Sequence, residues 1–291
     1  MRATPIWVLI RLRRQSLVLA PSNAPGMRVL FFGDITGPRA VAALADRLPH
    51  WRRTYRIDAV VANAENAVVS RTDNPRIGFG MDSRVVETLL EAGVDVITGG
   101  NHSWDTPDAD DMLESARVLR PHNVFGALAG KGVIELKTDR GALVVVNMMG
   151  TSAAGERYTI SDPLPSFDAL QFPDAPVIVD FHSELVTEKQ TFAHAVDGRA
   201  AAVLGTHTHE PSAILHRLPK GTFFVADVGM VGPDGGVQGI APEFFIREMR
   251  EFKEPHHFDL AGGPLLLGAV LMELGTQSPS IERFAPPDWK K

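Results

Sequence analysis

Residues 27–41, MRVLFFGDITGPRAV, form one strand-then-helix unit and indicate the fold class. The apolar run 28–32 predicts a buried strand that ends at Asp34. Thr36 and Pro38 suit the start of a helix, because a hydroxyl can cap free N–H groups and proline fits a first helical turn. The apolar side chains that recur on one face of this helix are Val41, Leu44 and Leu48.

The same pattern repeats outward from this stretch. A second predicted strand at 58–62 ends at residues 63–66 (NAEN), and a third at 94–98 ends at residues 99–102 (GGNH). Between them, a helix is predicted from an apolar stripe that begins at Val85. Strands that alternate with helices predict a parallel sheet with helices packed on its faces.

The second half of the chain continues as α/β. Further strands are predicted at 143–147, 177–181, 201–205, 223–226 and 265–271. A helix is predicted at 183–196, and 213–218 should pair antiparallel with 223–227 across a Pro-Lys-Gly turn. We therefore expect one domain, residues 27–291, built on a mixed sheet or on two stacked sheets.

Composition narrows the classes of protein to consider. The chain has 291 residues, a formal net charge of −6 and 44% hydrophobic residues, which excludes a largely disordered or collagen-like chain. The negative charge argues against binding of long nucleic acid, which requires a cationic surface. Cysteine is absent, so a bound metal would be held by His, Asp, Glu and Asn. Absence of cysteine also fits a cytoplasmic location.

The N-terminal stretch differs from the rest. Its apolar segments are interrupted by Arg11, Arg13 and Arg14, so no unbroken membrane span or secretory core is predicted. A Pro- and Gly-containing run, 21–26, then precedes the first strand. We expect residues 1–26 to be a disordered or misassigned extension, dispensable for folding and activity.

Polar side chains directly follow most of these strands. Each taken alone has an ordinary explanation: Asp34 could cap a helix, His182 could be a hydrogen-bonded core histidine, and His207-Thr208-His209 is ambiguous as an isolated motif. Loops at the carboxyl ends of strands converge, however, so these groups are expected to meet. The strand-end residues are Asp34, Glu65, Asn66, Asn101, His102, His182, His207 and His209.

Their joint occurrence predicts a dinuclear metal centre. Carboxylates and imidazoles in this number suit two divalent ions about 3.5–4 Å apart. Glu65 is the expected bridging carboxylate, because a bridging anion offsets the repulsion between two cations. Such a pair generates hydroxide near neutral pH and holds a phosphoryl group for in-line attack.

Six ordered motifs carry a resemblance to a known family. They are GDITG at 33–37, NAEN at 63–66, GNHSWD at 100–105, VDFH at 179–182, GTHTH at 205–209 and DVGM at 227–230. The chain from Met27 onward resembles the bacterial YmdB-like metallophosphoesterases of the calcineurin-like superfamily. The resemblance implies a four-layer αββα sandwich of two mixed sheets flanked by helices, with a dinuclear iron or manganese site, zinc also being compatible. It also implies hydrolysis of phosphodiesters, with 2′,3′-cyclic and other cyclic nucleotides, including 3′,5′-cyclic ones, as substrates.

The resemblance assigns roles position by position. It implies that Asp34, Asn66 and His209 bind one metal and that Glu65 bridges the two metals. Asn101, His182 and His207 would bind the second metal. His102 would act as the general acid that protonates the leaving oxygen, a task suited to imidazole.

The sequence leaves three questions open. The loop of residues 68–77 is longer than the family pattern, so substrate preference is undetermined, and Arg71 and Arg76 could contact phosphate or only solvent. The alternatives to a phosphodiesterase are a phosphomonoesterase or nucleotidase at the same site, and a regulatory protein that responds to a nucleotide or RNA with incidental turnover. The expected partner is a small phosphodiester, with no membrane, and a homo-oligomer is compatible with the sequence.

Overall fold

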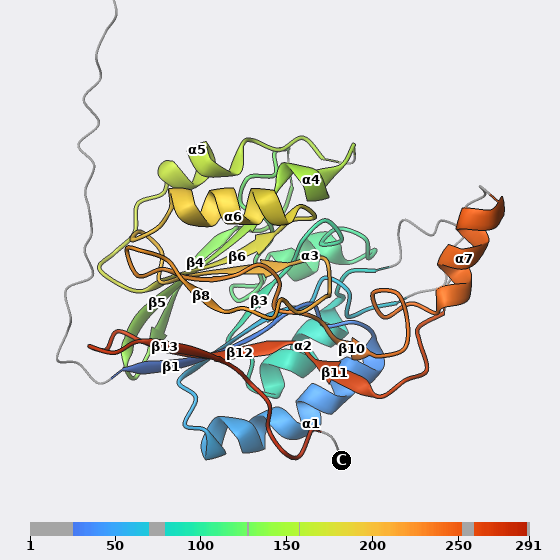
Figure 1. The fold of residues 1–291 in the computed structure, drawn as a ribbon, viewed down its shortest axis with the longest axis horizontal. Coiled ribbons are helices and arrows are strands. Elements are labelled where there is room, and N and C mark those ends of the chain that lie inside the picture. Colours follow the sequence, from blue (N-terminus) through green and yellow to red (C-terminus); the bar gives the residue numbers. More distant parts are fainter. Residues whose placement is uncertain (1–25, 70–78, 127, 157, 252–258, 290–291) are drawn as a thin grey trace, which may run out of the picture.

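The computed structural model describes residues 26–69, 79–126, 128–156, 158–251 and 259–289. Two β-sheets stack on one another in it, and helices cover the outer face of each (Figure 1). This arrangement confirms the expected αββα sandwich. Residues 1–25 and 70–78 lie outside the described residues, and so do the predictions on the N-terminal extension and on most of the long loop.

The five-stranded sheet contains the strand predicted at residues 28–32. Its order is β13-β12-β1-β2-β3, with β1–β2–β3 parallel, as predicted, and β12 and β13 antiparallel. The bounds are β1 (Met27–Phe32), β2 (Ala59–Asn63), β3 (Val96–Thr98), β12 (Ala269–Leu274) and β13 (Ser280–Arg283).

The six-stranded sheet has the order β4-β5-β6-β7-β9-β8. Its central strands run parallel, whereas β4 pairs antiparallel with β5 and β8 pairs antiparallel with β9. The β8–β9 pair confirms the predicted antiparallel segment. The bounds are β4 (Val133–Thr138), β5 (Gly141–Met149), β6 (Val177–His182), β7 (Ala202–Thr206), β8 (His216–Arg217) and β9 (Phe223–Val225).

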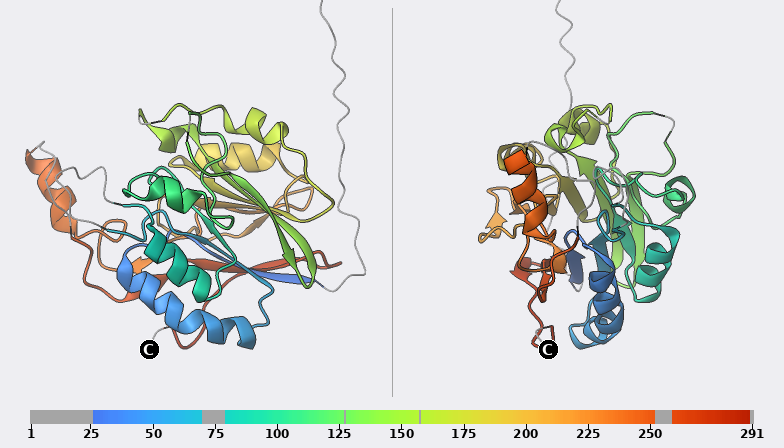
Figure 2. Two further views of the ribbon diagram at one scale, coloured as in Figure 1. Left: turned by 180° about the vertical axis from the view of Figure 1, so that it is seen from behind. Right: turned by 90° about the vertical axis from the view of Figure 1, so that its right-hand side faces the viewer.

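Each sheet is covered by its own helices. In Figure 1, α1 and α2 lie below the five-stranded sheet and α5 and α6 lie above the six-stranded sheet. The helices are α1 (Pro38–Thr54), α2 (Ser83–Glu91), α3 (Ala109–Leu113), α4 (Thr151–Ala154), α5 (Pro163–Asp168), α6 (Val186–Ala195) and α7 (Pro242–Glu251). The left view of Figure 2 shows α7 extending away from both sheets.

Alternation along the strands produces an apolar layer on each face of the five-stranded sheet, and a third layer lies between the six-stranded sheet and α5 and α6. Val29 and Phe31 of β1 face the six-stranded sheet and pack with Ile178 of β6 between the sheets. Leu30 and Phe32 face the opposite way and pack under α1 and α2. Successive side chains of a strand point to opposite faces, so one short apolar strand contributes to two cores.

Two element boundaries differ from the prediction. Helix α6 begins at Val186, not at residue 183, because Glu184 lies before the helix and contacts His207. The predicted strand 265–271 is divided into β11 (Leu265–Leu267) and β12 at Gly268. A side chain at Gly268 would collide with the backbone of Gly229, since a Cβ there would lie 2.1 Å from its carbonyl oxygen. Strand β11 then pairs with β10 (Val231–Pro233) instead of β1.

Candidate active site

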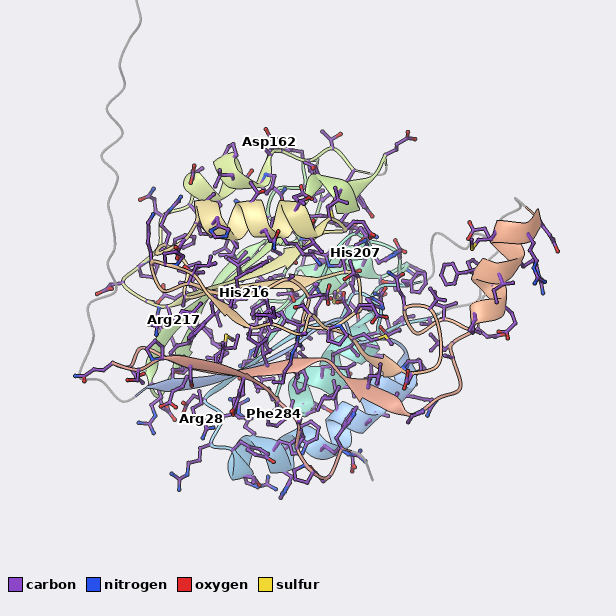
Figure 3. All side chains as sticks on the ribbon, in the orientation of Figure 1. Arg28, Asp162, His207, His216, Arg217 and Phe284 are labelled. Atoms are coloured by element: carbon purple, nitrogen blue, oxygen red, sulfur yellow. The ribbon has the colours of Figure 1, made fainter. Side chains whose placement is uncertain are left out.

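The carboxyl ends of both sheets supply the candidate site. From the five-stranded sheet, Asp34 follows β1, Glu65 and Asn66 follow β2, and Asn101 follows β3. From the six-stranded sheet, His182 ends β6, and His207 and His209 follow β7. In Figure 3, His207 lies between the level of α6 and the level of the five-stranded sheet, as expected for a site formed by both.

The structure brings these side chains together. His182 Nε2 lies 3.0 Å from Glu65 Oε1 and 2.9 Å from Asn101 Oδ1. Asp34 Oδ1 lies 3.9 Å from ring nitrogens of both His182 and His209.

Two further contacts complete the cluster. Asn66 Nδ2 lies 2.9 Å from His209 Nε2, and the rings of His182 and His207 meet edge to face at a centroid distance of 4.6 Å. Ligand atoms of Glu65, His182 and His207 all lie within 4.8 Å of one another. All seven residues that the sequence analysis proposed as metal ligands thus share one small volume.

Each of the three histidines has one ring nitrogen fixed by an acceptor outside the cluster. His209 Nδ1–H donates to the carbonyl oxygen of Gln238 at 2.9 Å. His207 Nε2 lies 2.9 Å from the carboxylate of Glu184, to which it donates. The remaining nitrogen of each ring therefore carries a lone pair, which is the form in which imidazole binds a metal.

For His182 the same conclusion follows from a longer hydrogen-bonded chain. The Thr206 hydroxyl donates to Asp180 Oδ1 at 2.7 Å, so its oxygen accepts from His182 Nδ1–H at 2.9 Å. His182 Nε2 then faces the oxygens of Glu65 and Asn101 with a lone pair. Acceptors that face acceptors in a buried space require a cation between them, so this donor set fits a metal ion.

Burial sets the charges of these groups. Burial lowers the pKa of His182 to about 4, against the opposing effect of Glu65, so the ring is neutral at pH 7. Burial raises the pKa of Asp34 well above its usual value, and the carboxylates of Asp227 and Glu65 raise it further. Closely spaced buried carboxylates are stabilised by bound cations.

The backbone leaves room for this cluster. A Cβ at Gly100 would lie 2.0 Å from Glu65 Oε2 and 2.3 Å from His182 Nε2, so only glycine fits there. His207 and His209 adopt φ angles of 98° and 65°, in the left-handed region that non-glycine residues rarely occupy. The N–H of His207 donates to the Asp34 carboxylate at 3.1 Å, which fixes this turn against the cluster. Backbone strain of this kind costs about 1–3 kcal/mol per residue and occurs mostly at functional sites.

His102 contacts the cluster through its backbone, and its ring is held by Asp105. Its backbone N–H donates to Glu65 Oε2 at 3.3 Å, and its Nδ1 lies 2.7 Å from Asp105 Oδ2. The ring also contacts Phe79 at a centroid distance of 4.7 Å. A carboxylate that accepts from Nδ1–H orients the ring and leaves Nε2 to exchange a proton, so this pair is arranged for acid–base chemistry.

The sequence analysis missed the groups that orient the histidines. Glu184 follows His182 by two residues and shares its strand-end position, which is a signal that could have identified it. Thr206 lies within the GTHTH motif but was given no role. The carbonyl of Gln238 carries no sequence signal, because any residue has a backbone oxygen.

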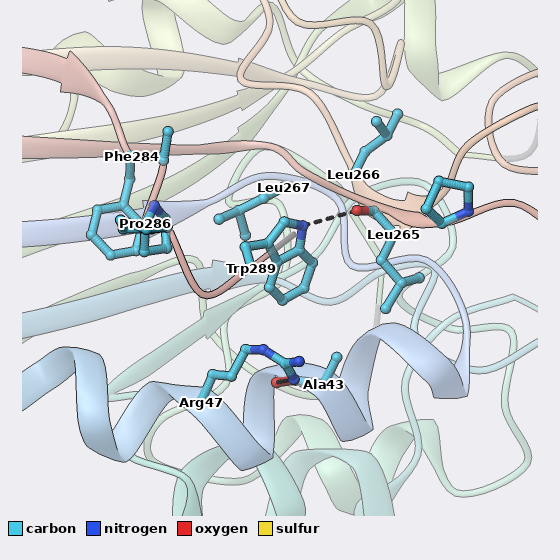
Figure 4. Close-up of a pocket in the computed structure, with 11 residues that line it drawn as sticks. Ala43, Arg47, Leu265, Leu266, Leu267, Phe284, Pro286 and Trp289 are labelled. Carbon is cyan, nitrogen blue, oxygen red and sulfur yellow. Dashed lines mark hydrogen bonds between the residues drawn. The ribbon is translucent and has the colours of Figure 1, made fainter. Parts of the chain in front are cut away.

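A large pocket elsewhere on the molecule lacks this chemistry. It has a volume of about 790 Å³ and lies between α1 and the C-terminal segment (Figure 4). Among the described residues that line it, Arg47 is the one ionisable group, and Trp289 closes it by donating to the carbonyl oxygen of Leu265 at 2.9 Å. These lining residues offer no carboxylate or imidazole for acid–base or metal chemistry.

Known proteins with similar sequences and structures show the family of this chain. The chain is 32% identical over 257 residues to the 2′,3′-cyclic-nucleotide 2′-phosphodiesterase of Bacillus subtilis strain 168, a match that covers 87% of this chain and 93% of the relative. The crystal structure of a novel phosphatase from Mycoplasma pneumoniae superposes with a TM-score of 0.79 at 29% identity, covering 92% of this chain and 97% of that one.

A second crystal structure and a protein-family model also match this chain. A hypothetical protein from Thermus thermophilus superposes with a TM-score of 0.77 at 37% identity, covering 88% of this chain and 99% of that one. The model of the YmdB-like protein family matches residues 30–285, which include all the candidate site residues. The chain therefore belongs to the YmdB-like protein family.

Proposed function

We propose that this protein is a metal-dependent phosphodiesterase that opens 2′,3′-cyclic nucleotides at a dinuclear site. The observation that carries the proposal is the orientation of the three histidines, each tied by one ring nitrogen and presenting the other to the buried carboxylates. In this proposal Asp34, Asn66 and His209 would hold one ion, and Glu65 would be shared by both ions. Asn101, His182 and His207 would hold the second ion.

The ions and the protein have separate tasks in the reaction. When bound, iron or manganese ions supply positive charge that activates water and stabilises negative charge on the phosphoryl oxygens. The ligand residues hold that charge at one place, where the diester would be oriented for in-line displacement. His102 supplies the proton that the departing oxygen needs, and Asp105 holds its ring in place.

The substrate class is inferred from the curated relative. That relative is named as a 2′,3′-cyclic-nucleotide 2′-phosphodiesterase, so the departing atom would be O2′ and the product a 3′-nucleotide. Opening of 3′,5′-cyclic nucleotides at the same site belongs to the proposal as a second activity.

A small diester remains the expected partner, and a cytoplasmic location remains a prediction. No helix among the described residues has both the length and the apolar character needed to cross a membrane.

The test combines metal analysis with a substrate panel. Purified protein would be analysed for iron, manganese and zinc and then assayed on 2′,3′- and 3′,5′-cyclic nucleotides, bis-p-nitrophenyl phosphate and nucleoside monophosphates. We expect two ions per chain and the highest kcat/KM on 2′,3′-cyclic nucleotides, with 3′-nucleotides as products. Preferred hydrolysis of monophosphates would make the protein a nucleotidase. Tight nucleotide binding without turnover would instead favour a regulatory role.

Two variants make the assignment specific. Glu65→Gln removes the negative charge expected to bridge two cations, so both metal content and activity should be lost. Asp197→Asn is the matched control, because Asp197 is also a buried carboxylate but lies at the opposite end of β7. If Glu65→Gln keeps two ions and near-normal turnover, the proposed bridge is wrong.

A further inference from the structure

A buried ion pair lies next to the turn formed by His207, Thr208 and His209 and has no role in the proposed reaction. Lys189 of α6 is fully buried, and its Nζ lies 2.9 Å from Oδ2 of Asp227, which is 3% exposed. Asp227 follows β9 and opens the DVGM motif. Gly205 of β7 lies close to both segments, because a Cβ there would lie 2.0 Å from the carbonyl oxygen of Ala226 and 3.0 Å from Lys189 Cδ.

The carboxylate of Asp227 accepts two hydrogen bonds from Thr208, the residue between His207 and His209. Its Oδ2 accepts from the backbone N–H of Thr208 at 3.1 Å and from the Thr208 hydroxyl at 2.7 Å. Its Oδ1 accepts from the N–H of Gly229 at 2.7 Å. Thr208 thus has two of its hydrogen bonds to one buried carboxylate, while His207 and His209 on either side occupy left-handed conformations.

These contacts favour a role for the ion pair in positioning the turn over a role in stabilising the fold. A buried ion pair contributes little net stability, because both charges must be removed from water. The pair does fix geometry, because Lys189 Nζ donates to Asp227 Oδ2 at 2.9 Å and orients this carboxylate as an acceptor. The turn that it fixes carries two candidate ligands that belong to different ions, so a small shift of Thr208 would move both imidazoles.

We propose that the Lys189–Asp227 pair is a positioning device that holds the His207–Thr208–His209 turn in the conformation that binds metal. The inference rests on the proposed function for the role of the two histidines. The groups that orient metal ligands typically change metal affinity about 10–100-fold when they are removed. Neither Lys189 nor Asp227 touches the substrate in this proposal, and both act through Thr208.

Three variants of the full chain test the pair. Thr208→Val removes the hydroxyl that Asp227 accepts while keeping the shape, and Thr208→Ser keeps the hydroxyl. The double variant Lys189→Met, Asp227→Asn removes both charges together, so no unpaired charge is left buried. Mn²⁺ affinity would be measured by calorimetry. We expect the Kd to rise about 10–100-fold in the double variant and less in Thr208→Val, with Thr208→Ser close to the parent protein.

A metal-independent measurement separates this proposal from the proposed function. Hydrogen–deuterium exchange of the metal-free protein would follow residues 207–210 separately from β7. We expect faster exchange at the turn in the double variant and unchanged exchange in β7. If the parent protein binds neither Mn²⁺ nor iron, the proposed function fails, and the exchange result alone decides whether the pair holds the turn.

Asp197→Asn serves as the structural control. Asp197 is a buried carboxylate that accepts from the N–H groups of Lys220 and Thr222, and it lies far from the histidine turn at the other end of the sheet. It should lower the melting temperature without changing Mn²⁺ affinity or exchange at the turn. If the double variant behaves in the same way as Asp197→Asn, the pair is only structural and the proposal is overturned.

Discussion

His102 and Asp105 show how a residue can lie at the candidate site without being one of the proposed metal ligands. The backbone of His102 contacts Glu65, whereas its ring turns to Asp105 three residues later. A ligand residue would direct a ring nitrogen at the carboxylates, as His182 does. The observed geometry therefore suits proton transfer to a leaving oxygen.

The first prediction follows from that geometry. His102→Ala should keep its metal and its fold, and turnover of 2′,3′-cyclic nucleotides should fall about 10²–10⁴-fold. Turnover of bis-p-nitrophenyl phosphate should fall much less, because nitrophenolate leaves without a proton. Steady-state kinetics on both substrates measure the difference, and His194→Ala, at an exposed histidine of α6, is the control. Equal losses on both substrates would assign His102 to phosphate binding instead.

At the residue scale, much of the candidate site could be predicted from the sequence. Asp34, Glu65 and His182 follow apolar runs, and the convergence of parallel strand ends predicts that they meet. Their orienting partners could not be predicted in this way. Of these partners, Glu184 alone has a sequence signal, its place just after a strand, whereas the carbonyl of Gln238 becomes a partner only through the path of the chain in three dimensions. Lys189 resembles any lysine of a helix until it is found buried.

At the scale of elements, α2 shows how loops near the site are tied to a helix. Asp82 accepts from the N–H of Val85 at 2.8 Å, and Asp108 accepts from the N–H of Ser83 at 2.8 Å. Two of the free N–H groups at the start of α2 are thereby satisfied. Asp108 comes shortly after the GNHSWD motif, so this cap also anchors the segment that carries Asn101 and His102.

The second prediction concerns this cap. Asp82→Ala should lower the free energy of unfolding by about 1 kcal/mol, because the N–H of Val85 loses its acceptor. Urea unfolding measures the change. Glu87→Ala, at an exposed position in the middle of the same helix, should change stability by less than about 0.5 kcal/mol. Equal effects of the two variants would show that the Asp82 cap contributes nothing specific.

Strands and helices with a clear apolar pattern were predicted near their observed positions. Elements and boundaries that depend on tertiary contacts were not. The central strands of both sheets appear as short apolar runs, so β1, β2 and β6 were expected near their observed positions, whereas the more polar edge strands β4 and β13 were not predicted. The start of α6 was placed three residues early, because Glu184 leaves the helix to contact His207. Helix α7 was not predicted: none of its residues is buried, so packing against the sheets does not define it.

At the scale of the whole molecule, the site is divided between the two sheets. Asp34 and Glu65 come from the five-stranded sheet, and His182 and His207 come from the six-stranded sheet. The apolar layer between the sheets joins these halves. Ions bound at the strand ends would join them a second time, so metal binding and global stability should be linked.

The last prediction is this linkage. Above the Kd for Mn²⁺, each tenfold increase in free Mn²⁺ should add about 1.4 kcal/mol per bound ion to the free energy of unfolding, because the folded chain binds the ion and the unfolded chain does not. Removal of metal by a chelator should lower the melting temperature correspondingly. Glu65→Gln should flatten the dependence, since it removes one of the buried carboxylates that the ions neutralise. Asp197→Asn, although less stable, should keep the slope. A parent protein whose stability does not depend on metal concentration would contradict a metal site shared between the sheets.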